Sequence, residues 1–214
     1  MVNKSWRIGL SIVLAVSIIT ACESETKQLP ILGPTIIKNT VVDGALIADT
    51  TFGAIRGFKF WDQDSNVITE NTVEGKLYVT DFFFTSCPTI CPKMKQQMLR
   101  IHDRYLDEDK VVLLSHSIDP VRDSVQRLKT FAEKLGVQTE KWHLMTGNRD
   151  SIYSMAKHYV IAAQEDPDAP GGFAHSGAFL LVDTKRQIRG IYDGTDPQEV
   201  DQLMDDIQFL NEQE

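Results

Sequence analysis

The stretch LYVTDFFFTSCPTICPKM, residues 77–94, joins a strongly apolar run to two cysteines that lie four residues apart and are each followed by proline. The run from Leu77 to Phe84 has the continuous apolar character of a buried central strand. Beyond the cysteines, apolar residues recur at spacings of four, three and four: Met94, Met98, Ile101 and Tyr105. Such spacing places them on one face of a helix. The stretch therefore predicts a buried strand, a loop that carries the cysteines, and a helix.

Strand-like and helix-like segments alternate downstream of this unit. Strands are predicted over 111–118, 141–147, 177–183 and 187–192, and helices over 125–135, 152–159 and 200–210. Gly136 ends the first of these helices. The alternation predicts an α/β layered fold. The closing pair of strands and final helix narrow this expectation to a thioredoxin-like fold, in which helices flank a central mixed β-sheet.

The first 22 residues have the pattern of a lipoprotein export signal. Lys4 and Arg7 precede an uncharged apolar run over residues 8–19, which is shorter than the roughly 20 residues that a transmembrane helix needs. The sequence ITAC at residues 19–22 resembles a bacterial lipobox, which implies cleavage before Cys22 and lipidation of its thiol. The alternatives are an uncleaved anchor, or secretion with Cys22 free.

Three segments follow from this pattern. We expect a signal peptide over residues 1–21, a lipid-anchored tether with an N-terminal extension or hairpin over residues 22–50, and a folded domain over residues 51–214. The domain would lie in the cell envelope, outside the cytoplasm, on a bacterial membrane that the sequence does not identify as inner or outer. The formal net charge of −8 gives the chain no basic footprint for nucleic acid, so we expect no nucleic-acid partner.

Cys87 and Cys91 remain as a pair once Cys22 is assigned to the lipid. A disulfide between them would close a very small loop and add little stability, because entropic stabilisation grows with loop length. Each cysteine precedes a proline, which disfavours helical geometry, whereas Pro92 suits the first position of a helix. We therefore expect both sulfurs in a tight loop, with the helix beginning near Pro92. The helix N-terminus would favour thiolates, which are both nucleophiles and metal ligands.

A metal site at this pair needs at least one further ligand. Two thiolates suit Cu(I), an added imidazole suits either Cu(I) or Cu(II), and a Cys2His set with a fourth ligand would also suit zinc. The histidines are His102, His116, His143, His158 and His175. Position favours His175, which follows the flexible segment DAPGGFA and lies just before the apolar strand Gly177–Val182. His116 is the rival, although its place inside LLSHSI also fits a satisfied core histidine.

Three segments in this order resemble the Sco/SenC family of thioredoxin-fold copper proteins: TSCPTICP at residues 85–92, SIDPVRDS at 117–124 and AHSGAFLLVD at 174–183. The resemblance covers residues 50–210. It implies that Cys87, Cys91 and His175 bind copper. It also implies that the protein delivers copper to, or prepares, the binuclear copper site of cytochrome c oxidase. The expected partner is the copper-bearing subunit of that oxidase or another copper chaperone.

The chain departs from the pattern of the family at three positions near the expected ligands. Many members carry histidine where this chain has Ser86 and aspartate where it has Thr89, and an acidic residue often stands at the position of Ala174. None of the three is an expected ligand. The first two changes alter the surface around the loop, and the third removes a carboxylate that would tune His175.

The main rival function is enzymatic. A thiol-disulfide oxidoreductase would use Cys87 as the attacking thiolate and Cys91 as its resolving partner, although thioredoxin-type motifs space their cysteines as CxxC. A third class is a lipid-anchored copper or redox sensor. We expect a metallochaperone rather than an enzyme.

Other residues near the motifs have both a functional and a structural interpretation. Met94 and Met98 are soft enough for copper, but their helical spacing favours core packing. Asp119 is a candidate carboxylate behind the metal ligands. In the same segment, Asp123 with Gln126 fits the start of the following helix, as an N-cap with its capping-box partner.

Overall fold

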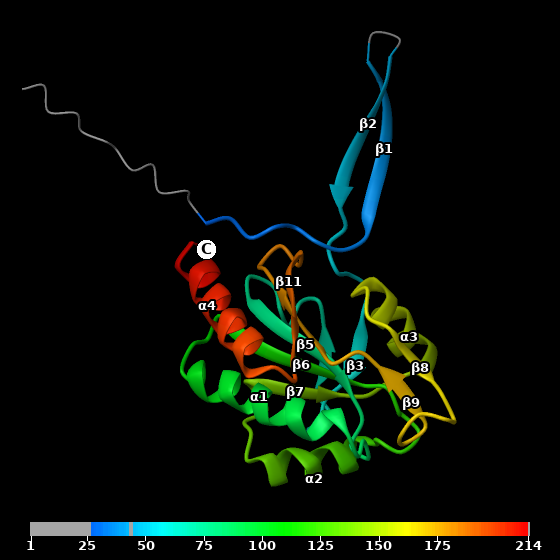
Figure 1. Ribbon diagram of the computed structural model, residues 1–214, viewed down its shortest axis with the longest axis vertical. Coiled ribbons are helices and arrows are strands. Elements are labelled where there is room, and N and C mark those ends of the chain that lie inside the picture. Colours follow the sequence, from blue (N-terminus) through cyan, green and yellow to red (C-terminus); the bar gives the residue numbers. More distant parts are fainter. Residues whose placement is uncertain (1–26, 43–44, 214) are drawn as a thin grey trace, which may run out of the picture.

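A mixed sheet forms the centre of the computed structural model, which describes residues 27–42 and 45–213. Its strands are β5 (Leu77–Phe83), β6 (Val111–Ser117), β7 (Trp142–Met145), β10 (Ala178–Val182) and β11 (Ile188–Asp193). They lie in the order β11-β10-β5-β6-β7 (Figure 1). β5, β6 and β7 are parallel, whereas β10 is antiparallel to β5 and β11. The predicted thioredoxin-like fold with a central mixed sheet is confirmed.

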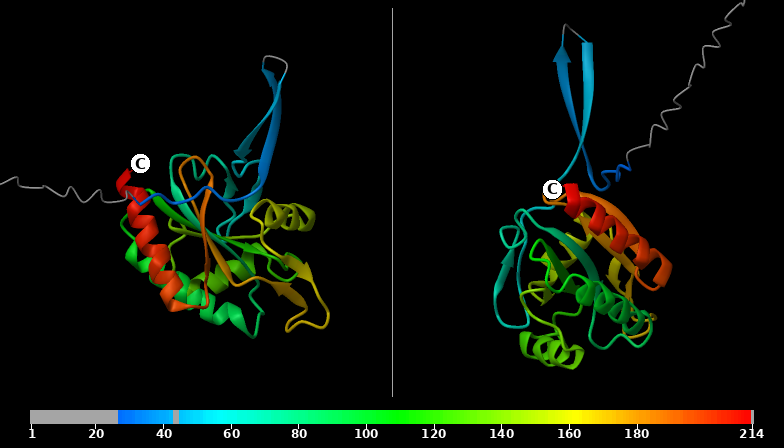
Figure 2. Two further views of the ribbon diagram at one scale, coloured as in Figure 1. Left: turned by 45° about the horizontal axis from the view of Figure 1, so that its top comes forward. Right: turned by 90° about the vertical axis from the view of Figure 1, so that its left-hand side faces the viewer.

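Helices cover both faces of this sheet. They are α1 (Ile90–Arg104), α2 (Val125–Leu135), α3 (Arg149–His158) and α4 (Pro197–Gln213). Side chains alternate across β5. Phe83 therefore faces α1 and α2, where it stacks on Phe131. Phe82 faces the other way and contacts Tyr159, at the end of α3. α4 packs beside α1 on the first face (Figure 2).

Two short hairpins complete the body of the protein. One consists of β3 (Lys59–Trp61) and β4 (Val67–Thr69), and the other of β8 (Ala163–Glu165) and β9 (Phe173–His175). The loop expected before the last strands, residues 166–172, is the connection within this second hairpin, whose flanking strands were not predicted. Its strands have three residues each, which is too short for alternation of apolar and polar residues to reveal them.

The N-terminal segment lies against the body before it forms a third hairpin. Leu32 forms a β-bridge with Ile188 at the start of β11, and Arg189 donates hydrogen bonds to the carbonyl groups of Leu29 and Pro30. The chain then forms β1 (Thr35–Val42) and β2 (Ala45–Phe52), an antiparallel hairpin that extends away from the sheet (Figures 1 and 2).

Several predictions about the N-terminus fall beyond what the structure describes. The expected signal peptide over residues 1–21 and the lipidated Cys22 lie outside the described residues. Within residues 27–42 and 45–213, no helix is both long and apolar enough to cross a membrane. The expected boundary between residues 50 and 51 falls inside β2.

α1 begins two residues before its predicted start, whereas α2 has its predicted range but a different N-cap. α1 begins at Ile90, so Cys91 lies in its first turn and Pro92 follows there, where a backbone N–H has no partner within the helix. α2 is capped by Ser124, whose side chain accepts a hydrogen bond from the backbone N–H of Arg127. The predicted cap at Asp123 is therefore wrong. The end of α2 at Gly136 is confirmed, with φ of 71°.

His116, the rival ligand, is part of the core on the α3 face of the sheet. Its ring stacks on Phe82 and meets Phe60 and Tyr159, and the residue is 1% exposed. Neither ring nitrogen has a hydrogen-bond partner among the described residues. The expectation of a satisfied histidine is thus wrong, because the side chain is buried without polar partners. Burial lowers the pKa of His116 from 6.5 to about 3.

This burial predicts a specific sensitivity to acid. Between pH 6.5 and 3 the unfolded chain binds a proton at His116 and the folded chain does not, so stability falls as pH falls. Replacing His116 with leucine should therefore shrink the loss in unfolding free energy between pH 7 and pH 5 by about 2 kcal/mol. Urea denaturation of both proteins at the two pH values measures this difference. An equal loss in the variant would contradict it.

Candidate metal centre

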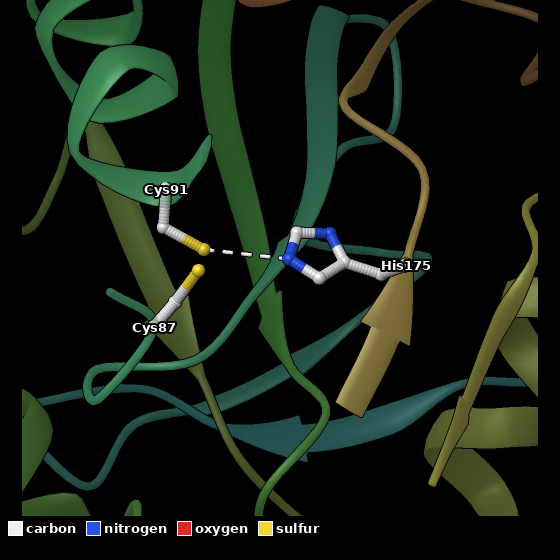
Figure 3. A group of neighbouring side chains, drawn as sticks. All are labelled: Cys87, Cys91 and His175. Atoms are coloured by element: carbon white, nitrogen blue, oxygen red, sulfur yellow. Dashed lines mark hydrogen bonds between the residues drawn. The ribbon is translucent and has the colours of Figure 1, made fainter. Parts of the chain in front are cut away.

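Cys87, Cys91 and His175 converge at the edge of the sheet where β5 ends (Figure 3). Their potential ligand atoms all lie within 4.8 Å of one another. The Sγ atom of Cys91 is 3.4 Å from Nε2 of His175. Both cysteines are free thiols. The three residues come from two segments more than 80 positions apart in the sequence, so the fold itself assembles the group.

The cysteine loop follows from the strand and helix that flank it. β5 ends at Phe83, and the backbone N–H of Cys87 then donates to the carbonyl of Phe84, which closes a turn. The chain enters α1 at Ile90, so Cys91 is directed by a helical turn and Cys87 by the loop. Cys87 is 9% exposed and Cys91 4%. Cys87 is thus the sulfur nearer to solvent.

A buried carboxylate holds the start of this loop. Asp123, which is 0% exposed, accepts hydrogen bonds from the backbone N–H and the hydroxyl of Thr85 at 3.0 and 2.5 Å. It also accepts one from the hydroxyl of Ser117 at the end of β6. Arg127 of α2 donates to the Thr85 hydroxyl and pairs with Asp123. The role of Asp123 is therefore to tie the cysteine loop to the segment between β6 and α2.

The β8–β9 hairpin carries His175 to the cysteines. Ala163 of β8 pairs with His175 at the end of β9. The hairpin turn lies close to the cysteine loop because Gly171 has φ of +84° and no side chain, and a Cβ there would lie 2.7 Å from the Phe84 ring. Phe84 also contacts the rings of Phe173 and His175. Phe84 is thus the apolar spacer between the two parts of the site.

A backbone carbonyl orients the His175 ring. The Nδ1 atom lies 3.0 Å from the carbonyl oxygen of Ser176, which can only accept, so Nδ1 carries the proton and donates. The lone pair is then on Nε2, the atom that faces Cys91. Burial lowers the pKa of His175, against the opposing effect of the Ser176 carbonyl, and this favours the neutral ring. The carbonyl orients the ring without the carboxylate that many family members carry at the position of Ala174.

The two thiols differ in acidity. For Cys87, burial raises the pKa, but the hydrogen bond from the Cys91 thiol and the backbone N–H groups of Thr89 and Cys91 outweigh burial and leave the pKa lowered. For Cys91, burial and the neighbouring Cys87 raise the pKa well above its ordinary value. Of the two thiols, Cys87 therefore loses its proton more readily, and Cys91 keeps its proton to higher pH.

A buried ion pair lies behind the cysteines. Lys95, one turn after Cys91 in α1, is 2.8 Å from the Asp81 carboxylate, and Ser115 donates a hydrogen bond to the same carboxylate. The ammonium group of Lys95 also lies 3.9 Å from the centre of the Phe83 ring. This ion pair was not predicted from the sequence. The spacing of four residues between Cys91 and Lys95 was the available signal, because it places both on one helical face.

The remaining candidates lie elsewhere. Met94 and Met98 are fully buried in the core, as predicted. The Asp119 carboxylate pairs with Arg122, and none of its hydrogen bonds to described residues reaches a cysteine or His175. The expected role of Asp119 behind the ligands is therefore not supported, and Asp123 acts on the loop instead.

The family model described as SCO1/SenC matches residues 49–210. The chain belongs to this family. The SCO1 protein homolog of Bacillus subtilis is 27% identical over 166 residues, which are 77% of this chain and 86% of the relative. The resemblance noted from the three sequence segments is confirmed.

Solved structures of SCO1/SenC proteins superpose on the chain. A family lipoprotein from Bacillus anthracis matches with a TM-score of 0.67, 27% identity, and coverage of 74% of this chain and 95% of that one. BsSco, described with a disulfide switch and as a member of the Sco family of cytochrome c oxidase assembly proteins, has a TM-score of 0.63, 27% identity and coverage of 72% and 91%. Arabidopsis thaliana ScoI, solved with copper bound, has a TM-score of 0.62, 26% identity and coverage of 75% and 100%.

The donor set of this SCO1/SenC protein fits copper chemically. Two sulfur donors and one imidazole nitrogen suit both Cu(I) and Cu(II). The Nε2 lone pair is free of a backbone partner and faces the sulfurs, and no carboxylate belongs to the group. The absence of oxygen donors from this group disfavours Mg²⁺ and Ca²⁺.

Proposed function

We propose that this protein binds one copper ion through Cys87, Cys91 and His175 and delivers it to the binuclear copper site of cytochrome c oxidase. The observation that carries the proposal is the convergence of two thiols and one correctly oriented imidazole from segments distant in sequence. Membership of the SCO1/SenC family and the copper-bound structure of a relative support copper as the ion.

Delivery requires a site that holds copper without enclosing it. Three protein ligands leave room for an incoming thiolate or imidazole, so copper can pass through a shared-ligand intermediate without release of a hydrated ion. Cys91 is the more buried cysteine, whereas Cys87 and His175 lie nearer to solvent. An acceptor ligand therefore meets Cys87 and His175 first, and Cys91 releases the ion last.

A redox role is the second candidate, and the difference in thiol acidity favours it. A Cys87 thiolate can attack a disulfide of the partner, after which Cys91 resolves the mixed disulfide and the partner leaves as a dithiol. The protein is then oxidised to a Cys87–Cys91 disulfide, and two electrons have passed to the partner. Such a disulfide would remove two copper ligands, so the two functions exclude each other at any one moment.

Competition titration tests the proposal directly. The purified full-length protein, reduced and held in detergent, is titrated with Cu(I) against a chelator of known affinity. We expect one tightly bound ion per chain, and its loss after replacement of both Cys87 and Cys91 by serine. Weak binding of Cu(I) by the parent protein would refute copper delivery. The reduction potential of the Cys87–Cys91 pair would then be the quantity that tests the redox role.

Membrane attachment through a lipid on Cys22 is part of the same proposal. Replacing Cys22 with serine should move the protein from the membrane fraction to the soluble fraction after export, because the thiol that takes the lipid is lost. Cell fractionation with immunoblotting measures the distribution, and Cu(I) affinity should be unchanged. A variant that stays in the membrane fraction would show that the apolar run over residues 8–19 is itself the anchor.

A further inference from the structure

A groove leads from the metal centre along the seam between α1 and α2. Its inner part has a volume of about 300 Å³, and its lining includes Cys87 and Cys91. Most of the remaining lining consists of side chains from the two helices: Pro92, Lys95, Gln96 and Leu99 from α1, and Phe131 and Leu135 from α2. The two cysteines therefore open onto a mainly apolar surface.

The outer part of the groove has the opposite character. This second hollow, of about 650 Å³, shares Thr85 and Phe131 with the first, so the two are adjacent. Its lining includes three cations, Arg122, Arg127 and Lys134, and no carboxylate. The chain as a whole has a formal charge of −8, so this end of the groove differs in sign from the protein around it.

The cations of the outer part are accessible to a partner. Arg122 and Arg127 pair with Asp119 and Asp123, but these carboxylates are 3% and 0% exposed, whereas about half of each arginine side chain is exposed. Within the described part of the chain, Arg127 uses its Nε atom for these contacts, and no ion pair forms at Lys134. A carboxylate from outside would therefore meet exposed donors, while the acidic partners of the two arginines lie buried beneath them.

We propose that this groove docks a segment of the protein that receives the copper. The segment presents a soft ligand to the copper ion from the side of Cys87, an apolar side chain to Phe131 and Leu135, and one or more carboxylates to the basic end. The inference rests on the proposed function, because two of the three proposed ligands line the groove. Its cations attract and orient an acidic segment that the rest of this acidic chain repels. A second copy of the chain is a poorer occupant for the same reason.

Two synthetic peptides test this assignment on the full-length, copper-loaded protein. Both contain the same Cys-Xaa-Xaa-Xaa-Cys acceptor and one leucine, and they differ only in three flanking glutamates or three flanking lysines. We expect Cu(I) to reach the acidic peptide about tenfold faster at low ionic strength. That advantage should fade as added salt screens the charges.

Charge reversal locates the effect on the protein. The double substitution Arg122→Glu and Lys134→Glu should remove the advantage of the acidic peptide, while Cu(I) affinity stays within about twofold, because neither residue is a ligand. Lys185→Glu, compared with the single substitution Lys134→Glu, is the matched control for charge, since Lys185 is exposed in the turn between β10 and β11, at the opposite edge of the sheet. The control should keep the preference for the acidic peptide.

The outcomes separate this inference from the proposed function. Equal transfer to both peptides, or a preference that survives the double substitution, would refute docking in the groove. Neither result would contradict the proposed binding of copper. If the parent protein bound no Cu(I), the proposed function would fail. Chemical-shift mapping of the metal-free protein with a serine version of the acidic peptide would then test docking alone. Chemical-shift changes at the groove residues would support docking there. Changes confined to another face, or a concentration-dependent dimer that covers the groove, would refute it.

Discussion

Replacing His175 with alanine should lower the affinity for Cu(I) by at least about 100-fold, because it removes one of three ligands from the proposed site. The same change should leave reduction of a small disulfide by Cys87 and Cys91 within about twofold. Neither step of thiol-disulfide exchange uses the imidazole as a nucleophile or a leaving group. Cu(I) affinity and the rate of disulfide reduction, measured in this one variant, therefore distinguish copper delivery from thiol-disulfide chemistry.

Controls for this prediction come from the same chain. His158→Ala removes an exposed histidine at the end of α3 and should leave Cu(I) affinity unchanged. Thermal unfolding of His175→Ala reports whether the β8–β9 hairpin still folds, since His175 also contacts Phe84. A folded variant that retained the affinity of the parent would rule out His175 as a ligand, with no other described histidine grouped with the cysteines.

The features that were predicted correctly from sequence are local ones. The apolar run over residues 77–84 became β5, and the spacing of Met94, Met98 and Ile101 gave the buried face of α1. Each depends on neighbours within a few positions, where the period of a strand or helix leaves a visible pattern. The same holds for Gly136, whose left-handed conformation ends α2.

The features that were missed depend on contacts between distant segments. Asp123 resembles a helix cap in the sequence, but its carboxylate binds Thr85, which lies 38 positions earlier. Lys95 forms its ion pair with Asp81 across the interface between α1 and β5. No periodicity links such partners, so only the fold reveals them. His175 was favoured by position, but the carbonyl that fixes its tautomer was visible only in the structure.

Alkylation should distinguish the two cysteines by a factor on the order of 100 or more, with Cys87 modified first. The thiolate is the reacting species, and the pKa is lowered for Cys87 and raised for Cys91, which is also the more buried. Brief treatment of the reduced, metal-free protein with iodoacetamide at pH 7, followed by peptide mass mapping, gives the ratio.

The pH dependence of alkylation gives a second readout. The rate at Cys87 should rise with pH and reach its plateau at a lower pH than the rate at an ordinary cysteine, because the Cys87 thiolate forms at lower pH. Bound Cu(I) should protect both sulfurs if both are ligands. Equal labelling of the two residues would mean that the thiolate is not localised on Cys87, and it would remove the physical basis for Cys87 as the attacking residue in the redox role.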